Sequence, residues 1–387
     1  MKICFLSQEY PPESHFGGIG TYTYNVAVEI ARLGHTVHVV TSTRARPRTY
    51  DEHGVFVHRI RQRNLRPQEL SRLFYSFQVA GKVAEIQCPF DIVQSSEFGA
   101  EGYVLSLRRR FHLVTRLATP FYLTEKLNGK SVSGSRLLFD MFERVQTLRS
   151  DGIVASTRAI ARTVAEKWRI DLSKIQIIPN SVDVGRIRQL GAGKDVPEIL
   201  KDREFVLYFG RLEERKGVHV LARAVPAVLG EFPEICAAFI GSDAGYQGGS
   251  MRAYIREQAG GYQERLLFFD NLPQENLFPI VRCAKLVVLP SLWEAFGFVC
   301  VEAMALGRPV IATAGSGFEE IIVDGVSGLL VEPGNVESLS SGIIKLLRDR
   351  AWREKIATKA EARASDFEVS RVLPGLINYY EQVRSKA

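Results

Sequence analysis

The chain has 387 residues, more than one ordinary hydrophobic core accommodates, so two domains are expected. Its 46% hydrophobic and 24% charged residues are typical of a folded globular protein and exclude a disordered one. The start, MKICFLSQEYPPE, predicts a buried strand rather than a signal peptide. No apolar run approaches the roughly 18 residues that a membrane span needs, which argues against a transmembrane protein.

The five cysteines are odd in number, widely spaced and mostly inside apolar runs. They are Cys4, Cys88, Cys236, Cys283 and Cys300. No CxxC or His-x-x-x-His spacing indicates a metal site. We therefore expect reduced core thiols, no bound metal and a cytoplasmic protein.

The net charge of +7 is concentrated in the first half of the chain. Residues 1–185 hold 25 Lys and Arg against 17 Asp and Glu, a net +8, whereas residues 186–387 hold 25 against 26, a net −1. The excess includes the runs RARPR (44–48), RIRQRNLR (59–66) and RRR (108–110). Such a basic half favours an anionic partner: a phosphate-bearing acceptor, a membrane surface or nucleic acid. An ordinary solvated basic face is the open alternative.

The first half alternates short β-rich runs with amphipathic segments. A strand at 2–7, a glycine-rich loop, a helical pattern at 21–34 and a strand at 36–41 form a βαβ unit, which implies parallel strands covered by helices. Four more strands continue the series: FDIVQSS (90–96), HLVTRL (112–117), GIVAS (152–156) and IQIIPNS (175–181). We expect one doubly wound domain over residues 1–184.

The second half repeats this alternation after a polar stretch, 185–204, that contains Gly and Pro and is expected to be a linker. Six strands follow: FVLYFG (205–210), ICAAFIGS (235–242), RLLFFDN (265–271), KLVVLPS (285–291), PVIAT (309–313) and GLLV (328–331). They predict a second doubly wound domain over 205–368. Residues 369–387 are expected to form an amphipathic helix across the domain junction. The predicted fold is α/β, with two Rossmann-like domains facing each other across a ligand-binding cleft.

A glycine-rich loop, HFGGIGTY, places Gly17, Gly18 and Gly20 between the first strand and the first helix. Glycines let backbone amides approach an anion, and the start of the helix adds its dipole. The spacing is not GxGxxG, and no acidic residue follows at the usual distance, so a dinucleotide-binding fingerprint is excluded. The loop is therefore either part of an anion site or a plain tight turn.

In the stretch FGRLEERKGVHVL, Arg211 and Lys216 flank the turn that leads from a strand into a helix. Two cations at this place suit a diphosphate, because Arg binds phosphate in a bidentate manner and Lys supplies a point charge. The alternative is an ordinary exposed loop in which Glu213 and Glu214 pair with these cations.

The stretch PSLWEAFGFVCVEAMALG sets Glu294 in a loop after a strand and Glu302 in the helix that follows. A carboxylate that accepts hydrogen bonds from two vicinal hydroxyls is the usual way to hold a ribose or a hexose. The backbone amides that open this helix can face the same ligand; they belong to Phe296, Gly297 and Phe298. Either Glu alone fits a helix cap or a structural ion pair equally well, but the Arg and Lys upstream favour a binding site.

Five motifs in chain order resemble the retaining glycosyltransferases of family 4 (glycosyl transferases group 1). They are GGIG after the first strand, IIPNSVD, GRLEERKG, the Glu-x7-Glu spacing of Glu294 and Glu302, and VDGVSGLLVEPGN. The resemblance covers nearly the whole chain. It implies a GT-B fold and a retaining transfer of a hexose from a nucleotide-diphosphate sugar to a hydroxyl acceptor, either a glycan or a lipid-linked molecule. It also implies that no catalytic metal or other cofactor takes part.

The resemblance assigns roles to the candidate residues of the second domain. By this resemblance, Arg211 and Lys216 neutralise the departing diphosphate, Glu302 holds the ribose, and Glu294 with the amides that follow it holds the donor sugar. We expect front-face retention, in which the leaving diphosphate helps to take the acceptor's proton. Glu294 as a covalent nucleophile is the alternative.

In the first domain the resemblance implies that Gly17 and Gly18 face the diphosphate and that the loops select the acceptor. Many relatives carry a His at the position that matches Ala118, so the donor-sugar contacts here are expected to differ. Two other functions stay open: a nucleotide-sugar epimerase of the same fold, and a nucleic-acid-binding protein that uses the basic half. The second is disfavoured because the basic runs lack interleaved aromatic residues.

Overall fold

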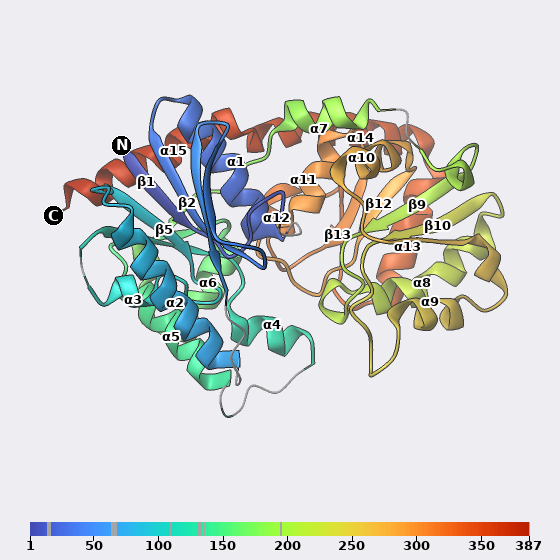
Figure 1. Cartoon of the computed structure of the whole chain (residues 1–387). Helices are drawn as coiled ribbons and strands as arrows, with labels where there is room; N and C mark the ends of the chain where they lie inside the picture. Colours follow the sequence, from blue (N-terminus) through green and yellow to red (C-terminus); the bar gives the residue numbers. More distant parts are fainter. Residues whose placement is uncertain are drawn as a thin grey trace. The chain divides into compact units, whose positions relative to one another are not determined.

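The computed structural model describes residues 1–13, 17–62, 68–108, 110–129, 134, 136–193 and 196–386 (Figure 1). The chain divides into two compact units. The first unit comprises Met1–Lys126, Lys130–Val182 and Val369–Ala387, and the second comprises Leu127–Gly129 and Asp183–Glu368. Each unit contains one mainly parallel sheet, so the predicted pair of doubly wound α/β domains is confirmed.

The sheet of the first unit has the strand order β3-β4-β2-β1-β5-β6-β7-β8. Its strands are β1 (Lys2–Leu6), β2 (Thr36–Thr43), β3 (Arg48–Glu52), β4 (Val55–Arg61), β5 (Ile92–Ser96), β6 (His112–Leu117), β7 (Gly152–Ala155) and β8 (Ile175–Ile177). All neighbours are parallel except β3 and β4. The central strands β1 and β5 are almost entirely buried, as expected for a parallel sheet that helices cover on both faces, although the second half of β5 is polar. Because the strand order reverses beside β1, the switch point of this sheet lies between β1 and β5.

Most helices of the first unit link its parallel strands, and the last one, α15, joins the unit after the chain has passed through the second unit. They are α1 (Gly18–Arg32), α2 (Gln68–Glu85), α3 (Tyr103–Ser106), α4 (Phe121–Leu127), α5 (Arg136–Arg149), α6 (Arg158–Trp168), the 3-10 turn η1 (Leu172–Lys174) and α15 (Val369–Ser385). The C-terminal helix was expected at 369–387, and α15 matches this position. It packs on α1, and the hydroxyl of Tyr379 accepts a hydrogen bond from the Ile153 amide at 2.9 Å.

The hairpin of β3 and β4 was not among the predicted strands. It incorporates parts of the basic runs that start at Arg44 and Arg59, which were noted only for their charge. His53 and Gly54 form the turn, and both have positive φ angles, 52° and 81°. Two-residue turns of this kind match the twist of antiparallel strands, which explains why the chain folds back here.

The sheet of the second unit has six parallel strands in the order β11-β10-β9-β12-β13-β14. They are β9 (Glu204–Phe209), β10 (Ile235–Ile240), β11 (Leu266–Phe269), β12 (Leu286–Leu289), β13 (Val310–Thr313) and β14 (Leu329–Val331). This is the strand order of the dinucleotide-binding folds, and the order reverses between β9 and β12. Ligands of such sheets bind at that switch point, beyond the carboxyl ends of the strands.

The helices of the second unit complete the alternation. They are α7 (Val184–Gly191), α8 (Val218–Glu231), α9 (Met251–Ala259), α10 (Gln274–Cys283), α11 (Phe298–Ala305), α12 (Phe318–Ile321), α13 (Val336–Arg348) and α14 (Arg350–Ala364). Short 3-10 turns are η2 (Glu198–Leu200), η3 (Glu214–Lys216), η4 (Gly260–Arg265) and η5 (Ser365–Phe367). In the described part of the chain, no helix is long and apolar enough to cross a membrane.

The stretch 185–204 was expected to be a linker, but the structure places most of it in the second unit. Most of α7 lies within it, and this helix packs on α10 and α11 of the second unit. Asp183 caps the helix by accepting a hydrogen bond from the Arg186 amide at 2.7 Å. A side chain at Gly191 would begin 2.2 Å from Leu306, so the helix lies directly on its neighbour. The polar composition of the stretch hid this helix because only one of its faces is buried.

Candidate functional site

Two loops meet at the switch point of the second unit: the loop after β9 and the loop after β12. Gly217 follows η3 with φ 65°, and a Cβ at this position would lie 1.8 Å from the carbonyl oxygen of Pro290. The Leu292 amide donates a hydrogen bond to the Arg215 carbonyl at 2.9 Å. Only glycine fits such an approach, so Gly217 allows the β9 loop to lie against the β12 loop.

This contact brings Lys216 and Glu294 together. The Lys216 ammonium forms an ion pair with Oε1 of Glu294, and the Ser291 hydroxyl donates a hydrogen bond to the same oxygen at 3.0 Å. The hydroxyl of Thr313, at the end of β13, donates to the Ser291 carbonyl at 2.5 Å. Glu294 is therefore fixed from three neighbouring strand ends, while its Oε2 has no hydrogen-bond donor among the described residues.

Burial and charge compete at this ion pair. Burial of Glu294 opposes its ionisation, but the charges of Lys216 and Arg215, with hydrogen bonds from Lys216 and Ser291, outweigh it and lower the pKa of Glu294. Burial lowers the pKa of Lys216 although Glu294 opposes that shift. The result is a carboxylate that stays ionised and an ammonium whose charge is poorly solvated, which favours an interaction with an incoming anion.

Arg211 and Arg215 share one carboxylate. Glu213 Oε1 lies 3.2 Å from Nη2 of Arg211 and accepts a hydrogen bond from Nη2 of Arg215 at 2.8 Å. Arg211 is 58% exposed, whereas Arg215 is buried and its Nε has no hydrogen-bond partner within the described residues. The alternative in which the loop cations pair with neighbouring glutamates thus holds for Arg211, which pairs with Glu213. Lys216 pairs with the distant Glu294 instead.

The start of α11 lies at the end of the same loop. Gly297 has φ 103°, and a Cβ there would lie 2.3 Å from the ring of Phe318. In the described part of the chain no side chain caps this helix, so the amides at its start stay available to a polar ligand. Phe296 is buried and packs edge-on against Phe298 at 5.4 Å. These two residues contribute backbone amides and packing rather than polar side chains.

Glu302 lies on α11, one turn beyond these amides. Its side chain is buried, and among the described residues none donates a hydrogen bond to its carboxylate. Burial raises the pKa of Glu302 to about 7. A buried carboxyl group without a partner is costly in a protein interior, so this one is better explained by a ligand that supplies donors.

Some contributors to this site were not predicted. Arg215 stands inside the motif GRLEERKG and was passed over in favour of its two neighbours. Ser291 orients Glu294, and its position directly after β12 was the available signal. Gly317 donates its amide to the Glu294 carbonyl at 2.9 Å, and a Cβ there would lie 2.6 Å from the Ala295 carbonyl oxygen. These contacts join segments that are remote in the sequence.

The remaining candidates lie in the first unit. Gly17 precedes α1 and Gly18 begins it, and a Cβ at Gly17 would lie 2.1 Å from a carboxylate oxygen of Glu9. Ala118 follows β6 and donates its amide to Oε2 of the buried Glu97 at 2.7 Å. The role of Gly17 and Gly18 toward a diphosphate stays a prediction, and so does the altered sugar contact at Ala118.

Comparison with known families decides what kind of protein carries this site. The profile of the Glycosyltransferase Family 4 domain matches residues 16–186, and the profile of the Glycosyl transferases group 1 domain matches residues 193–363. The chain is a family 4 glycosyltransferase of the GT-B fold. It is therefore a sugar-transferring enzyme, as the five motifs suggested.

Curated relatives align with this glycosyltransferase over nearly its whole length. An uncharacterized glycosyltransferase of Methanocaldococcus jannaschii is 26% identical, over 93% of this chain and 93% of its own. A D-inositol 3-phosphate glycosyltransferase of Frankia alni is 27% identical, over 98% of each chain.

Solved structures share the fold of the glycosyltransferase. A sucrose-phosphate synthase of Thermosynechococcus elongatus superposes with a TM-score of 0.82 at 21% identity, over 100% of both chains. The Anabaena protein HepE, in complex with UDP, superposes with a TM-score of 0.72 at 22% identity, over 99% of this chain and 100% of its own. At these identities the likeness concerns the fold.

Proposed function

We propose that this glycosyltransferase moves a hexose from a nucleotide-diphosphate sugar to a hydroxyl acceptor, with retention at the anomeric carbon and without a divalent metal. The observation that carries the proposal is the Lys216–Glu294 pair at the switch point between β9 and β12. There a cation for a phosphate and a carboxylate for a sugar hydroxyl lie side by side.

In this proposal the cations of the β9 loop stabilise the leaving group. The bond between the anomeric carbon and the diphosphate breaks, and negative charge develops on the diphosphate oxygens. Lys216 is partly buried and oriented by its ion pair with Glu294, and Arg211 is exposed enough to reach the ligand. Fixed positive charge placed where negative charge develops in the transition state is usually the largest single contribution to the rate enhancement. It also takes over the part that a divalent cation would play.

The two glutamates divide the donor between them. Glu302 accepts hydrogen bonds from the ribose hydroxyls, which explains a buried carboxyl group without a protein donor. Glu294 has Oε1 occupied by Lys216 and Ser291, and its Oε2 accepts from a sugar hydroxyl. The free amides at the start of α11 complete the contacts with the donor.

Retention follows by a front-face route. The acceptor oxygen forms its bond to the anomeric carbon on the face from which the diphosphate leaves, and the acceptor's proton passes to a diphosphate oxygen. Glu294 is disfavoured as a nucleophile because its ion pair with Lys216 and its hydrogen bond from Ser291 reduce its reactivity.

The relatives support the substrate classes in this proposal. The fold neighbour HepE is in complex with UDP, so UDP-sugars are the first donors to test. The inositol phosphate relatives favour a cyclic hydroxyl compound as acceptor.

Thermal-shift measurements with UDP-, GDP- and ADP-sugars identify the donor, because a ligand that binds the folded state raises the melting temperature. We expect a shift with one base class, transfer that persists in EDTA, and a product with the anomeric configuration of the donor by NMR. Activity that EDTA abolishes and Mg²⁺ or Mn²⁺ restores contradicts metal independence, and an inverted product contradicts retention.

A further inference from the structure

An open groove of about 1310 Å³ lies in the first unit between the β3–β4 hairpin and α2, outside the site described above. Its lining is strongly basic. Among the described residues, five cationic side chains line it: Arg44, Arg48, Arg59, Arg61 and Lys82. The described lining contains one carboxylate, Glu85. The fold has thus brought the runs RARPR and RIRQRNLR together on one surface, which the sequence alone did not indicate.

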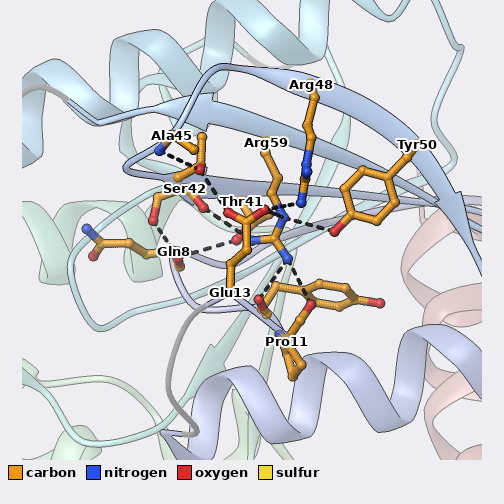
Figure 2. A network of polar contacts seen from close by, with 11 residues as sticks. Gln8, Pro11, Glu13, Thr41, Ser42, Ala45, Arg48, Tyr50 and Arg59 are labelled. Carbon is orange, nitrogen blue, oxygen red and sulfur yellow. Dashed lines mark hydrogen bonds and ion pairs between the residues drawn. The ribbon is translucent and has the colours of Figure 1, made fainter.

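One of the five cations holds the wall of the groove in place. Arg59 is 1% exposed and donates hydrogen bonds to the Tyr50 hydroxyl at 2.9 Å and to the Pro11 carbonyl at 2.8 Å (Figure 2). Glu13 lies 3.4 Å from Arg59 and also pairs with Arg48 (Figure 2). With Glu13 included, the described residues of the groove keep an excess of three positive charges, five cations against Glu13 and Glu85.

Arg44 and Arg61 supply most of the unbalanced charge. Both are exposed, and neither has a carboxylate within ion-pairing distance in the described part of the chain. Lys82 is different because it pairs with Glu85 at 2.9 Å. Two arginines without partners on one groove present several donors to an anion, and arginine binds phosphate in a bidentate manner.

The position of these arginines relates the groove to the rest of the first unit. Arg44 follows the last residue of β2, and Arg61 is the last residue of β4. Gln62 accepts a hydrogen bond at 2.6 Å from Gln8, which lies beyond the end of β1. One end of the groove therefore lies at the carboxyl ends of the parallel strands β2 and β4, and ligands of doubly wound sheets bind beyond such strand ends.

Gly81 keeps the floor of the groove open. It lies inside α2, and a Cβ there would meet no atom within 4 Å, so packing does not require glycine. Glycine inside a helix is destabilising by about 0.5–1 kcal/mol relative to alanine. A glycine that packing does not explain, at the lining of a basic groove, is consistent with space kept for a ligand.

We propose that this groove binds a phosphate ester carried by the acceptor. The proposal rests on the proposed function, because it assigns the phosphate to the molecule that receives the sugar. The described lining contains Arg, Lys, Gln and Thr but no aromatic side chain, so stacking with nucleic-acid bases is not provided for. The phosphate comes either from a soluble sugar or polyol phosphate or from a lipid headgroup.

The test uses the full chain and inorganic phosphate as the probe, measured by calorimetry at low salt with UDP present to occupy the donor site. We expect saturable phosphate binding, at least about tenfold weaker in Arg44→Gln/Arg61→Gln. The matched control is Arg108→Gln/Arg162→Gln, which removes two exposed arginines of the same unit outside the groove and should bind like the wild type. Equal affinity in both double variants, or no saturable binding to the wild type, overturns the proposal.

Two further arms identify the source of the phosphate. Glycerol 3-phosphate tests a soluble ester, and phosphatidylcholine vesicles with and without phosphatidylglycerol test a lipid headgroup by flotation. We expect the wild type to bind one of these ligands and the Arg44→Gln/Arg61→Gln variant to lose that binding. If the variant binds both ligands as the wild type does, the proposal is contradicted. A separate titration with UDP alone distinguishes the two ideas. UDP affinity should be unchanged in the Arg44→Gln/Arg61→Gln variant. If the wild type does not bind UDP, the proposed function is contradicted, but the result of the phosphate titration stays valid.

Discussion

The two sheets have comparable switch points with opposite chemistry. In the second unit, the loops at the switch point carry Lys216 and Arg215 against Glu294. In the first unit, the segment that follows β5 carries buried carboxyl groups that accept hydrogen bonds from main-chain amides. Glu97 accepts from the Ala118 amide at 2.7 Å, and Glu101 accepts from the Gln8 amide at 2.7 Å.

This difference has an electrostatic consequence. Burial raises the pKa of Glu97 to about 7 and that of Glu101 to about 8. The second switch point thus carries an ammonium beside an ionised carboxylate, whereas the carboxyl groups at the first are partly or largely protonated near neutral pH. In the first unit the positive charge lies instead in the groove beside α2. The same topology thus carries different charges at its two switch points, and the following predictions test what each does.

The largest effect is expected for Lys216. Lys216→Gln removes the buried cation and should reduce transfer by about a hundred- to a thousandfold, because stabilisation of the leaving group is lost. Lys201→Gln, at an exposed lysine of the same unit, is the control and should keep wild-type rates. Initial rates of sugar transfer provide the measurement.

Lys216→Gln also leaves the buried Glu294 unpaired, which destabilises the fold. The double variant Lys216→Gln/Glu294→Gln should recover stability in urea unfolding without recovering activity. Full recovery of activity would show that the cation has only a structural role.

The next largest effect separates the two glutamates. Glu302→Gln should weaken binding of UDP by about ten- to a hundredfold, since hydrogen bonds to charged groups contribute roughly 1.5–3 kcal/mol. Glu294→Gln should hardly change UDP affinity, because the sugar is absent from that ligand, but it should lower turnover with the intact donor. Calorimetry and initial rates make the comparison, and the opposite pattern reverses the two roles.

A smaller effect follows from the pKa of Glu302. With a pKa of about 7, the carboxylate is about 10% ionised at pH 6 and about 90% at pH 8, so UDP affinity should rise by up to about ninefold over this range. Binding should also release a proton, because the ribose hydroxyls favour the ionised form. Calorimetry in buffers of different ionisation enthalpy measures that proton. An equal pH dependence in Glu302→Gln would assign the effect to another group.

The smallest effect concerns the stability of the first unit. The pKa of Glu101 is raised to about 8 in the fold, so the folded state binds more protons than the unfolded state between pH 4.5 and 8. The stabilisation is fully present below pH 4.5 and is lost as the pH rises, by about 1 kcal/mol per pH unit near neutrality. Urea unfolding should show this contribution on top of those of Glu97 and Glu143, whose pKa values are also raised, and Glu101→Gln should reduce the slope by about 1 kcal/mol per pH unit. A variant with the wild-type slope contradicts the assignment to Glu101.

Local patterns in the sequence were sufficient for the parallel strands and for the positions of the site loops. Runs such as FVLYFG and KLVVLPS are apolar and end in Gly or Pro, so β9 and β12 were predicted closely. The β3–β4 hairpin was not predicted, because one of its strands is exposed and polar and carries no apolar run. The helix α7 was missed for a similar reason.

The candidate site was predicted as a set of residues but not as a set of contacts. Arg211, Lys216 and Glu294 lie in the loops after β9 and β12, and Glu302 lies one turn inside α11, as the spacing predicted. The ion pair of Lys216 with Glu294 joins residues 78 positions apart, and it depends on the approach that Gly217 allows. Neither the pKa of Glu302 nor the contribution of Arg215 is visible without the burial that the fold creates.

The return of the chain to the first unit through α15 determines the order in which the protein is completed during synthesis. The second unit consists almost entirely of one continuous stretch, 183–368, and can assemble before α15 has left the ribosome. The first unit cannot be completed then, although most of its residues emerge earlier. The Ile153 amide of β7 lacks its hydrogen-bond acceptor until Tyr379 is present. Gln94 likewise lacks the hydrogen bond that the Tyr380 hydroxyl donates to it at 2.6 Å. The nascent first unit therefore keeps the apolar surface that α15 covers exposed until α15 has been synthesised and has packed on it.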